Sequence, residues 1–89
     1  MTIFKSVWDA IEDDPVKKEN LKIRSHLMIE INEHIDSGRS TQVELAEILD
    51  TTQPRVSALR KNKINDFRLD MLVDFAIRLG LRVSLDVAV

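Results

Sequence analysis

The chain has 89 residues, 44% of them hydrophobic, and a formal net charge of −2 at pH 7, which is typical of one globular domain. It contains no cysteine, which excludes a disulfide framework and a cysteine-based metal site. No apolar run approaches the roughly 20 residues that span a bilayer, and the N-terminus lacks the pattern of a signal peptide. We therefore expect a single cytoplasmic domain, residues 1–89, without membrane contact.

Residues 1–14 are predicted to form an N-terminal arm. Phe4, Val7, Trp8 and Ile11 recur at helical spacing, and acidic residues lie on the other side. Trp8 is the only tryptophan, and large aromatic side chains are usually buried, so it is interpreted first as a core anchor. The alternative is that the arm contacts a partner protein.

Asp14 followed by Pro15 predicts the start of a long helix, with Asp as N-cap and Pro in the first position. The helix should extend to about Ser37, where Gly38 stops it. A helix of this length would span about 33 Å and form the scaffold of the domain. Its expected buried stripe consists of Leu21, Leu27, Met28, Ile31 and Ile35.

His26, Glu30 and His34 lie four residues apart on this helix and share a face. They supply only three candidate ligands without the HExxH spacing, so a solvated polar face is the preferred interpretation and no metal is expected. No glycine-rich phosphate loop occurs, and no catalytic constellation can be argued. We therefore predict neither a cofactor nor an enzyme.

The segment 41–61 predicts two short helices joined by a sharp turn. Thr41 and Glu44 form a capping box at the first helix start, and Asp50 can end that helix in a left-handed conformation. Thr52 is a good N-cap for the second helix, with Pro54 in its first turn. The first helix is expected to bury an apolar face formed by Val43, Ala46 and Leu49, and Leu45 and Ile48 widen this face.

In the second helix, Val56 and Leu59 should point back at the first helix, with Ala46 allowing close approach. This arrangement is typical of a helix-turn-helix, whose second helix enters the major groove of DNA. Residues 51–65 hold four basic and no acidic side chains, a local +4, so the remainder of the chain carries −6. A basic patch on an acidic body favours DNA binding over an ordinary helical hairpin with a solvated face.

Side-chain chemistry suggests how DNA contacts would be divided, since glutamine pairs with adenine and arginine with guanine through two hydrogen bonds. The residues predicted to contact bases are Gln53, Arg55, Ser57 and Arg60. Those predicted to contact phosphates are Arg39, Gln42, Thr52, Lys61 and Lys63.

Residues 62–66 are expected to form a polar loop, and Asp66 or Phe67 should lead into a further helix that Gly80 ends. Its apolar face would comprise Leu69, Leu72, Val73, Ala76 and Leu79. Residues 81–89 change to a period of two, which predicts a β-strand. The strand could pair with residues 2–4 or with its copy in a second chain, and we prefer a two-fold homodimer through Leu81, Val83, Leu85 and Val87.

The segment 41–63 resembles the Xre/Cro-repressor type of helix-turn-helix, with the pattern TQxELAxxLGVSQPxVSxLxxGK. Asp50 and Asn62 replace its two glycines, and both residue types tolerate a left-handed backbone. The matching residues are Thr41, Gln42, Glu44, Leu45, Ala46, Leu49, Gln53, Pro54, Val56, Ser57, Leu59 and Lys63. The flanking sequences are similar to the HigA-type antitoxin subgroup, so the resemblance covers nearly the whole chain.

We therefore expect a mainly α fold: a Cro-repressor-like helix-turn-helix bundle of about five helices with a short C-terminal β-strand. The expected function is that of a repressor whose dimer binds an inverted-repeat operator in double-stranded DNA, with recognition helices about 34 Å apart. The resemblance further implies an antitoxin that neutralises a cognate toxin and regulates its own promoter. The alternatives are a phage-type repressor without a toxin and a protein-interaction module that has lost DNA binding.

Overall fold

The computed structural model describes residues 14–89, so the predicted helical face and Trp8 of the arm lie outside the described residues. The described chain is mainly α, as predicted, and contains no β-strand. Its elements are α2 (Pro15–Asp36), α3 (Gln42–Ile48), α4 (Gln53–Arg60), the 3-10 helix η1 (Ile64–Asp66) and α5 (Leu69–Arg78).

The long helix α2 forms the scaffold. Its start is confirmed, because the Asp14 side chain accepts a hydrogen bond from the Val16 amide at 2.9 Å and Pro15 occupies the first position. It ends at the C-cap Ser37. The predicted stripe is buried at Leu21, Met28, Ile31 and Ile35, whereas Leu27 is half-buried.

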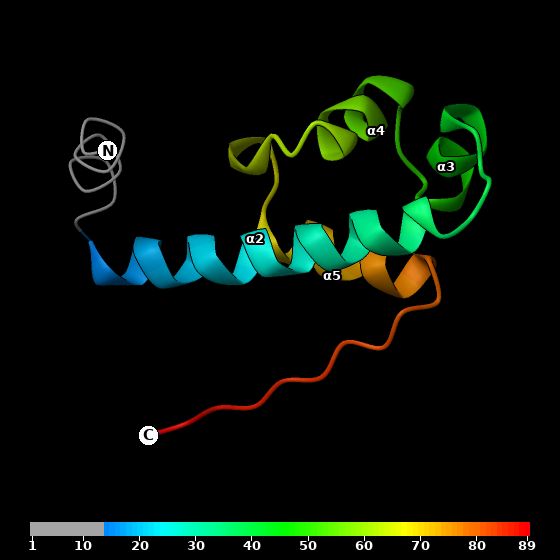
Figure 1. The fold of residues 1–89 in the computed structure, drawn as a ribbon. Helices are drawn as coiled ribbons and strands as arrows, with labels where there is room; N and C mark the ends of the chain where they lie inside the picture. Colours follow the sequence, from blue (N-terminus) through cyan, green and yellow to red (C-terminus); the bar gives the residue numbers. More distant parts are fainter. Residues whose placement is uncertain (1–13) are drawn as a thin grey trace.

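The other helices surround α2 on two sides. In Figure 1, α3, α4 and η1 lie above α2, while α5 lies along its C-terminal half. Helix α2 contacts α5, η1 and α4, and α3 contacts α4. The shared core is formed by Met28, Ile31, Ile35, Leu45, Ala46, Leu49, Val56, Leu59, Phe67, Leu72, Phe75 and Ala76.

Helices α3, α4 and α5 all end with the same left-handed turn. The residues after their C-caps have positive φ angles: 54° at Asp50, 58° at Asn62 and 89° at Gly80. In each turn the next amide donates back to a helix carbonyl, which satisfies the last carbonyls of the helix. These bonds are Thr51 to Ala46 at 2.9 Å, Lys63 to Ala58 at 3.1 Å and Leu81 to Ala76 at 2.9 Å. The predicted left-handed geometry of Asp50 and Asn62 is confirmed.

Two predicted core residues of α3 are exposed. Val43 is 51% exposed and Ile48 is 41% exposed, so their assignment to the buried face was wrong. The buried face consists of Leu45, Ala46 and Leu49. At about 100° per residue, Val43 lies nearly opposite Leu45 on the helix.

The prediction omitted two aromatic core residues. Phe67 and Phe75 are 2% and 5% exposed, and their rings meet edge to face with centroids 6.2 Å apart. Phe67 has an extended backbone, so it is an anchor before α5 and not the first helical residue. The expected polar loop contains η1, whose Ile64 is packed against the core. Gly80 does follow the end of α5, as predicted.

The C-terminal segment 81–89 leaves the helical body. Leu81 packs against the core, but beyond it the chain runs away from α2 and α5 (Figure 1). Among the described residues, no backbone hydrogen bond involves residues 82–89. The segment is therefore an extended chain without a strand partner, and the predicted strand does not form within residues 14–89.

Candidate nucleic-acid interface

The first half of the candidate interface is α3, fixed by its N-terminal cap. The Glu44 amide donates to the Thr41 hydroxyl at 3.1 Å, and the Thr41 amide donates to the Glu44 carboxylate at 2.8 Å. This is the predicted capping box, which satisfies two amides that the helix itself leaves unpaired. The helix start therefore has the geometry that the sequence predicted.

The second half is α4, which packs on α3 through two side chains. Val56 and Leu59 are both 0% exposed, and Ala46 of α3 is 8% exposed. The Thr52 hydroxyl accepts from the Arg55 amide at 3.3 Å and caps the helix, with Pro54 in the first turn. The predicted helix-turn-helix is thus present, with α4 in the position of a recognition helix.

The N-terminal end of α4 is open to solvent. Thr52 and Gln53 are exposed, while Ser57, one turn further along, is half-buried. Gln42 lies beside this end, and its side-chain amide donates to the Gln53 carbonyl at 3.0 Å. Gln42 therefore joins the two helix starts and keeps one further N–H available to an acceptor.

Arg55 folds back toward the body of the protein. Its Nη1 donates to the Asp66 carbonyl at 2.8 Å, and its guanidinium carbon lies 5.6 Å from the centre of the Phe67 ring. This distance permits a cation–π interaction. Arg55 was predicted to contact a base, but in this structure it is half-buried and its guanidinium is engaged in these two contacts.

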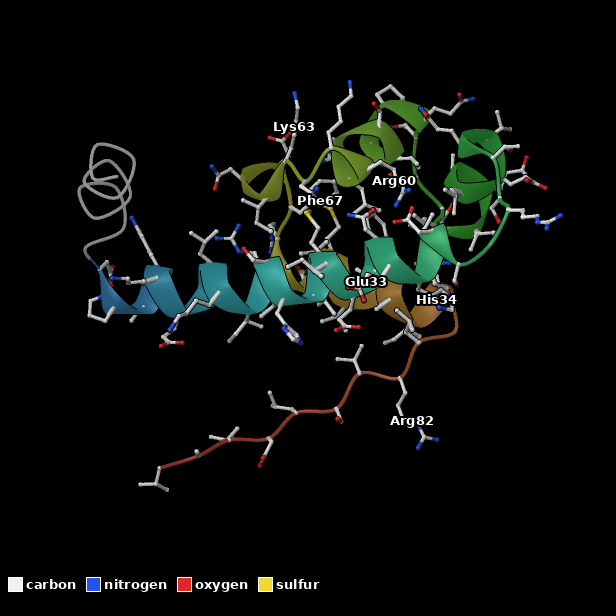
Figure 2. The ribbon with its side chains drawn as sticks, in the orientation of Figure 1. Glu33, His34, Arg60, Lys63, Phe67 and Arg82 are labelled. Carbon is white, nitrogen blue, oxygen red and sulfur yellow. The ribbon has the colours of Figure 1, made fainter. Side chains whose placement is uncertain are left out.

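Arg60 is also bound to another part of the protein. Its Nη1 donates to the Asn32 side-chain oxygen at 2.6 Å, and its Nη2 forms an ion pair with Asp36. Figure 2 shows Arg60 between α4 and α2. The Asn32 amide in turn donates to the Leu59 carbonyl at 3.0 Å and to the Asn62 side chain at 3.1 Å. This network attaches the C-terminal end of α4 to the scaffold.

Two lysines supply the unpaired positive charge of this region. Lys61 and Lys63 are exposed, and neither forms an ion pair within the described part of the chain. In Figure 2 the Lys63 side chain points away from α2. Arg39, in the loop before α3, is exposed as well. These side chains can bind a polyanion without breaking a contact within the protein.

The remaining residues considered in the sequence are those of the predicted dimer surface and of the polar face of α2. Leu81 is half-buried against the core, whereas Val83, Leu85 and Val87 of the predicted dimer surface are exposed. His26 lies 4.0 Å from Glu30, but the His34 ring is 3.1 Å from the Leu79 carbonyl. Residues 14–89 contain no cluster of three or more histidine or acidic side chains arranged for a metal.

Sequence reasoning missed three polar residues of α2: Arg24, Asn32 and Asp36. Arg24 contacts the segment after α4, and the other two bind Arg60. Of these three, Arg24 and Asn32 are half-buried, and each lies four positions from another polar residue on α2. That spacing could have indicated a polar stripe, but no local signal identifies partners that are distant in sequence.

No helix within residues 14–89 combines the length and apolar character needed to cross a membrane. A comparison with curated proteins found no match. A family model described as a helix-turn-helix domain matches residues 10–88, which is most of the chain. The matched region includes the α3–turn–α4 unit and its scaffold, and the chain belongs to this helix-turn-helix domain family.

Proposed function

We propose that the protein is a sequence-specific DNA-binding regulator, a repressor of the Xre/Cro type. The observation that carries the proposal is the exposed N-terminal end of α4, at Thr52 and Gln53. A helix-turn-helix places this end of its second helix against base edges in the major groove. The exposed Lys61 and Lys63, just past the other end of α4, would supply phosphate contacts that give affinity.

We assign base contacts first to Gln53 and Ser57. The glutamine amide can pair with adenine through two hydrogen bonds, and a serine hydroxyl can donate or accept. Arg55 and Arg60 can join them only by leaving the Asp66 carbonyl and Asp36, respectively. The proposed phosphate contacts are Arg39, Gln42, Thr52, Lys61 and Lys63.

A homodimer is the second part of the proposal. Segment 81–89 alternates apolar and mostly polar residues, has an unpaired backbone beyond Leu81 in the described chain, and exposes 87% of Leu85. It also borders an apolar groove of about 700 Å³, which is lined by Lys22, Ile23, His26, Leu27, Leu69, Val73, Val83, Ser84 and Leu85. Antiparallel pairing with the same segment of a second copy would hydrogen-bond one edge of this backbone and cover the groove.

The antitoxin role remains part of the proposal on the resemblance alone. The acidic arm, residues 1–14, is the surface we assign to a basic toxin, because opposite charges favour association. A phage-type repressor without a toxin is the alternative within the same class. Copurification of a small basic protein encoded beside the gene would distinguish the two.

Selection from a randomised duplex library tests the DNA-binding proposal. The expected product is an inverted repeat whose half-sites lie about 10 base pairs apart, centre to centre, matching two recognition helices on one side of B-DNA. Recovery of no enriched sequence would contradict sequence-specific binding. Enrichment of single half-sites without symmetry would contradict the dimer but would still agree with recognition of DNA by α4.

One observation favours a second candidate, a protein-interaction module that has lost DNA binding. Half of the basic side chains in residues 51–65, Arg55 and Arg60, are engaged in contacts with other residues of the same chain. The net charge of the whole chain is −2, which does not favour DNA binding. Such a module would bind duplexes weakly and without sequence preference, so the same selection separates the two functions.

A further inference from the structure

Two arginines from different helices contact the carbonyl groups of the segment that follows α4. This segment, residues 64–67, contains η1 and Phe67. Arg24 of α2 donates from Nη1 to the Ile64 carbonyl at 3.2 Å and to the Phe67 carbonyl at 3.1 Å. Arg55 of α4 donates to a third carbonyl of the segment, that of Asp66, at 2.8 Å.

Both guanidinium groups are held in place by further contacts. The Arg24 Nε donates to the Asn20 side chain at 2.6 Å, one turn earlier on α2. Arg55 lies over the ring of Phe67, which is only 2% exposed. We name this arrangement of Arg24, Arg55 and segment 64–67 the arginine clamp.

The arginine clamp fixes the backbone beside Lys63. The Lys63 amide donates to the Ala58 carbonyl of α4 at 3.1 Å, and its carbonyl accepts from the Asp66 amide at 3.0 Å. Lys63 therefore lies at the junction between the recognition helix and the clamped segment. A shift of η1 would change the direction of the Lys63 Cα–Cβ bond, and with it the space that the ammonium group can reach.

We infer that Arg24 and Arg55 are positioning residues that orient Lys63 toward the phosphate backbone of bound DNA. This inference rests on the proposed function, and it assigns Arg55 a role different from base recognition. The Ile64 carbonyl also accepts from the Phe67 amide at 3.2 Å, so it would keep a partner without Arg24. The Phe67 carbonyl, once released from Arg24, would lose its partner, so the segment would move to find another. The Cα–Cβ bond of Lys63 would then no longer be held in one direction.

The test measures the affinity of the folded protein for two duplexes over a series of salt concentrations. The probes are the duplex recovered by selection and a scrambled duplex of equal length. Lys63→Met should weaken binding to both by a similar factor and make the slope of log affinity against log salt shallower by about one. Arg24→Met should reproduce both effects in part, and the double variant should bind no more weakly than the weaker single variant. Lys18→Met, which removes an exposed charge from the same helix, is the matched control.

Arg24→Lys separates the geometry of the clamp from its charge. It keeps the positive charge but lacks the planar guanidinium that contacts two carbonyls, so we expect it to resemble Arg24→Met. The inference would be overturned if Arg24→Lys kept the wild-type affinity and salt slope. It would also be overturned if Arg24→Met lowered the affinity by the same factor in the wild-type protein and in the Lys63→Met variant. A wild-type protein that binds neither duplex in a salt-dependent manner would instead overturn the proposed function.

Arg55 is tested on a panel of single-base-pair variants of the recovered duplex. A positioning role predicts that Arg55→Ala loses the same factor on every member of the panel. A base contact predicts that the loss disappears for duplexes changed at one position. The second result would remove Arg55 from the clamp mechanism.

Discussion

Arg60, near the end of α4, forms an ion pair with Asp36, the last residue of α2. The guanidinium that the sequence directs toward DNA thus attaches the proposed recognition helix to the scaffold. A DNA phosphate and the Asp36 carboxylate would therefore compete for the same side chain.

Asp36→Asn should strengthen duplex binding, because it frees Arg60 and removes a negative charge near the interface. The pair is partly exposed, at 34% for the Arg60 side chain and 63% for Asp36. The free energy of unfolding should therefore fall by no more than about 1 kcal/mol. Duplex titration and urea denaturation measure the two effects. Glu33→Gln removes an exposed charge from the same helix end, and an equal gain in affinity there would argue against competition for Arg60.

Leu59→Ala should destabilise the domain strongly, because Leu59 is 0% exposed and packs α4 into the core. We expect the free energy of unfolding to fall by about 2–5 kcal/mol. Val43→Ala, at a side chain that is 51% exposed, should change it by about 0.5 kcal/mol or less. Thermal and urea denaturation followed by circular dichroism would compare the variants. Similar losses in both would mean that α4 does not pack through Leu59.

Asp50→Gly should stabilise the turn between α3 and α4. Asp50 has φ 54°, a region that glycine adopts with less strain, so we expect a gain of about 0.5–1 kcal/mol in the free energy of unfolding. Its contact with Arg78, at 3.9 Å between exposed groups, contributes little. Asp50→Ala should instead lower stability, since alanine disfavours this conformation. Urea denaturation of both variants gives the comparison, and a more stable alanine variant would contradict the left-handed turn.

Leu85→Asp should convert the proposed dimer into a monomer. Leu85 lines the apolar groove and would lie at the subunit contact, where an unpaired carboxylate would lose its hydration. Sedimentation analysis measures the mass, with Ala88→Asp, on the other face of the segment, as the control. Unchanged mass in Leu85→Asp would exclude pairing through this face.

Gln53→Ala and Lys63→Ala should weaken DNA binding in different ways. Gln53 is proposed to contact a base, so its loss should weaken the binding free energy by about 1–3 kcal/mol and relax specificity at one base pair. Lys63 is proposed to contact phosphate, so its loss should weaken all duplexes similarly and reduce the salt slope by about one. Titration against single-base-pair variants distinguishes these patterns, and a uniform loss from Gln53→Ala would contradict base recognition.

The helix ends were predictable from the sequence because their interactions are local. The Asp14, Thr41 and Thr52 caps each bond an amide two or three residues away. The left-handed positions of Asp50 and Asn62 also follow from residue type and from the break in the apolar pattern. These signals were enough to locate the helix-turn-helix.

The contacts of the long side chains were not predictable, because their partners are distant in sequence. Arg60 reaches Asp36, 24 residues earlier, and Arg24 reaches the Phe67 carbonyl, 43 residues later. Helical periodicity assigns a residue to a face, but a flexible arginine can fold back along the protein surface, as Arg55 does. Two of the four residues predicted to contact bases, Arg55 and Arg60, are therefore bound to other residues of the same chain.

The most direct test of the central claim is the affinity of the wild-type protein for its selected duplex and for a scrambled duplex, measured together at fixed salt. Recognition through the exposed end of α4 predicts a preference on the order of 10³-fold or more for the selected duplex. Equal affinity for both duplexes, or binding to neither, would contradict the account.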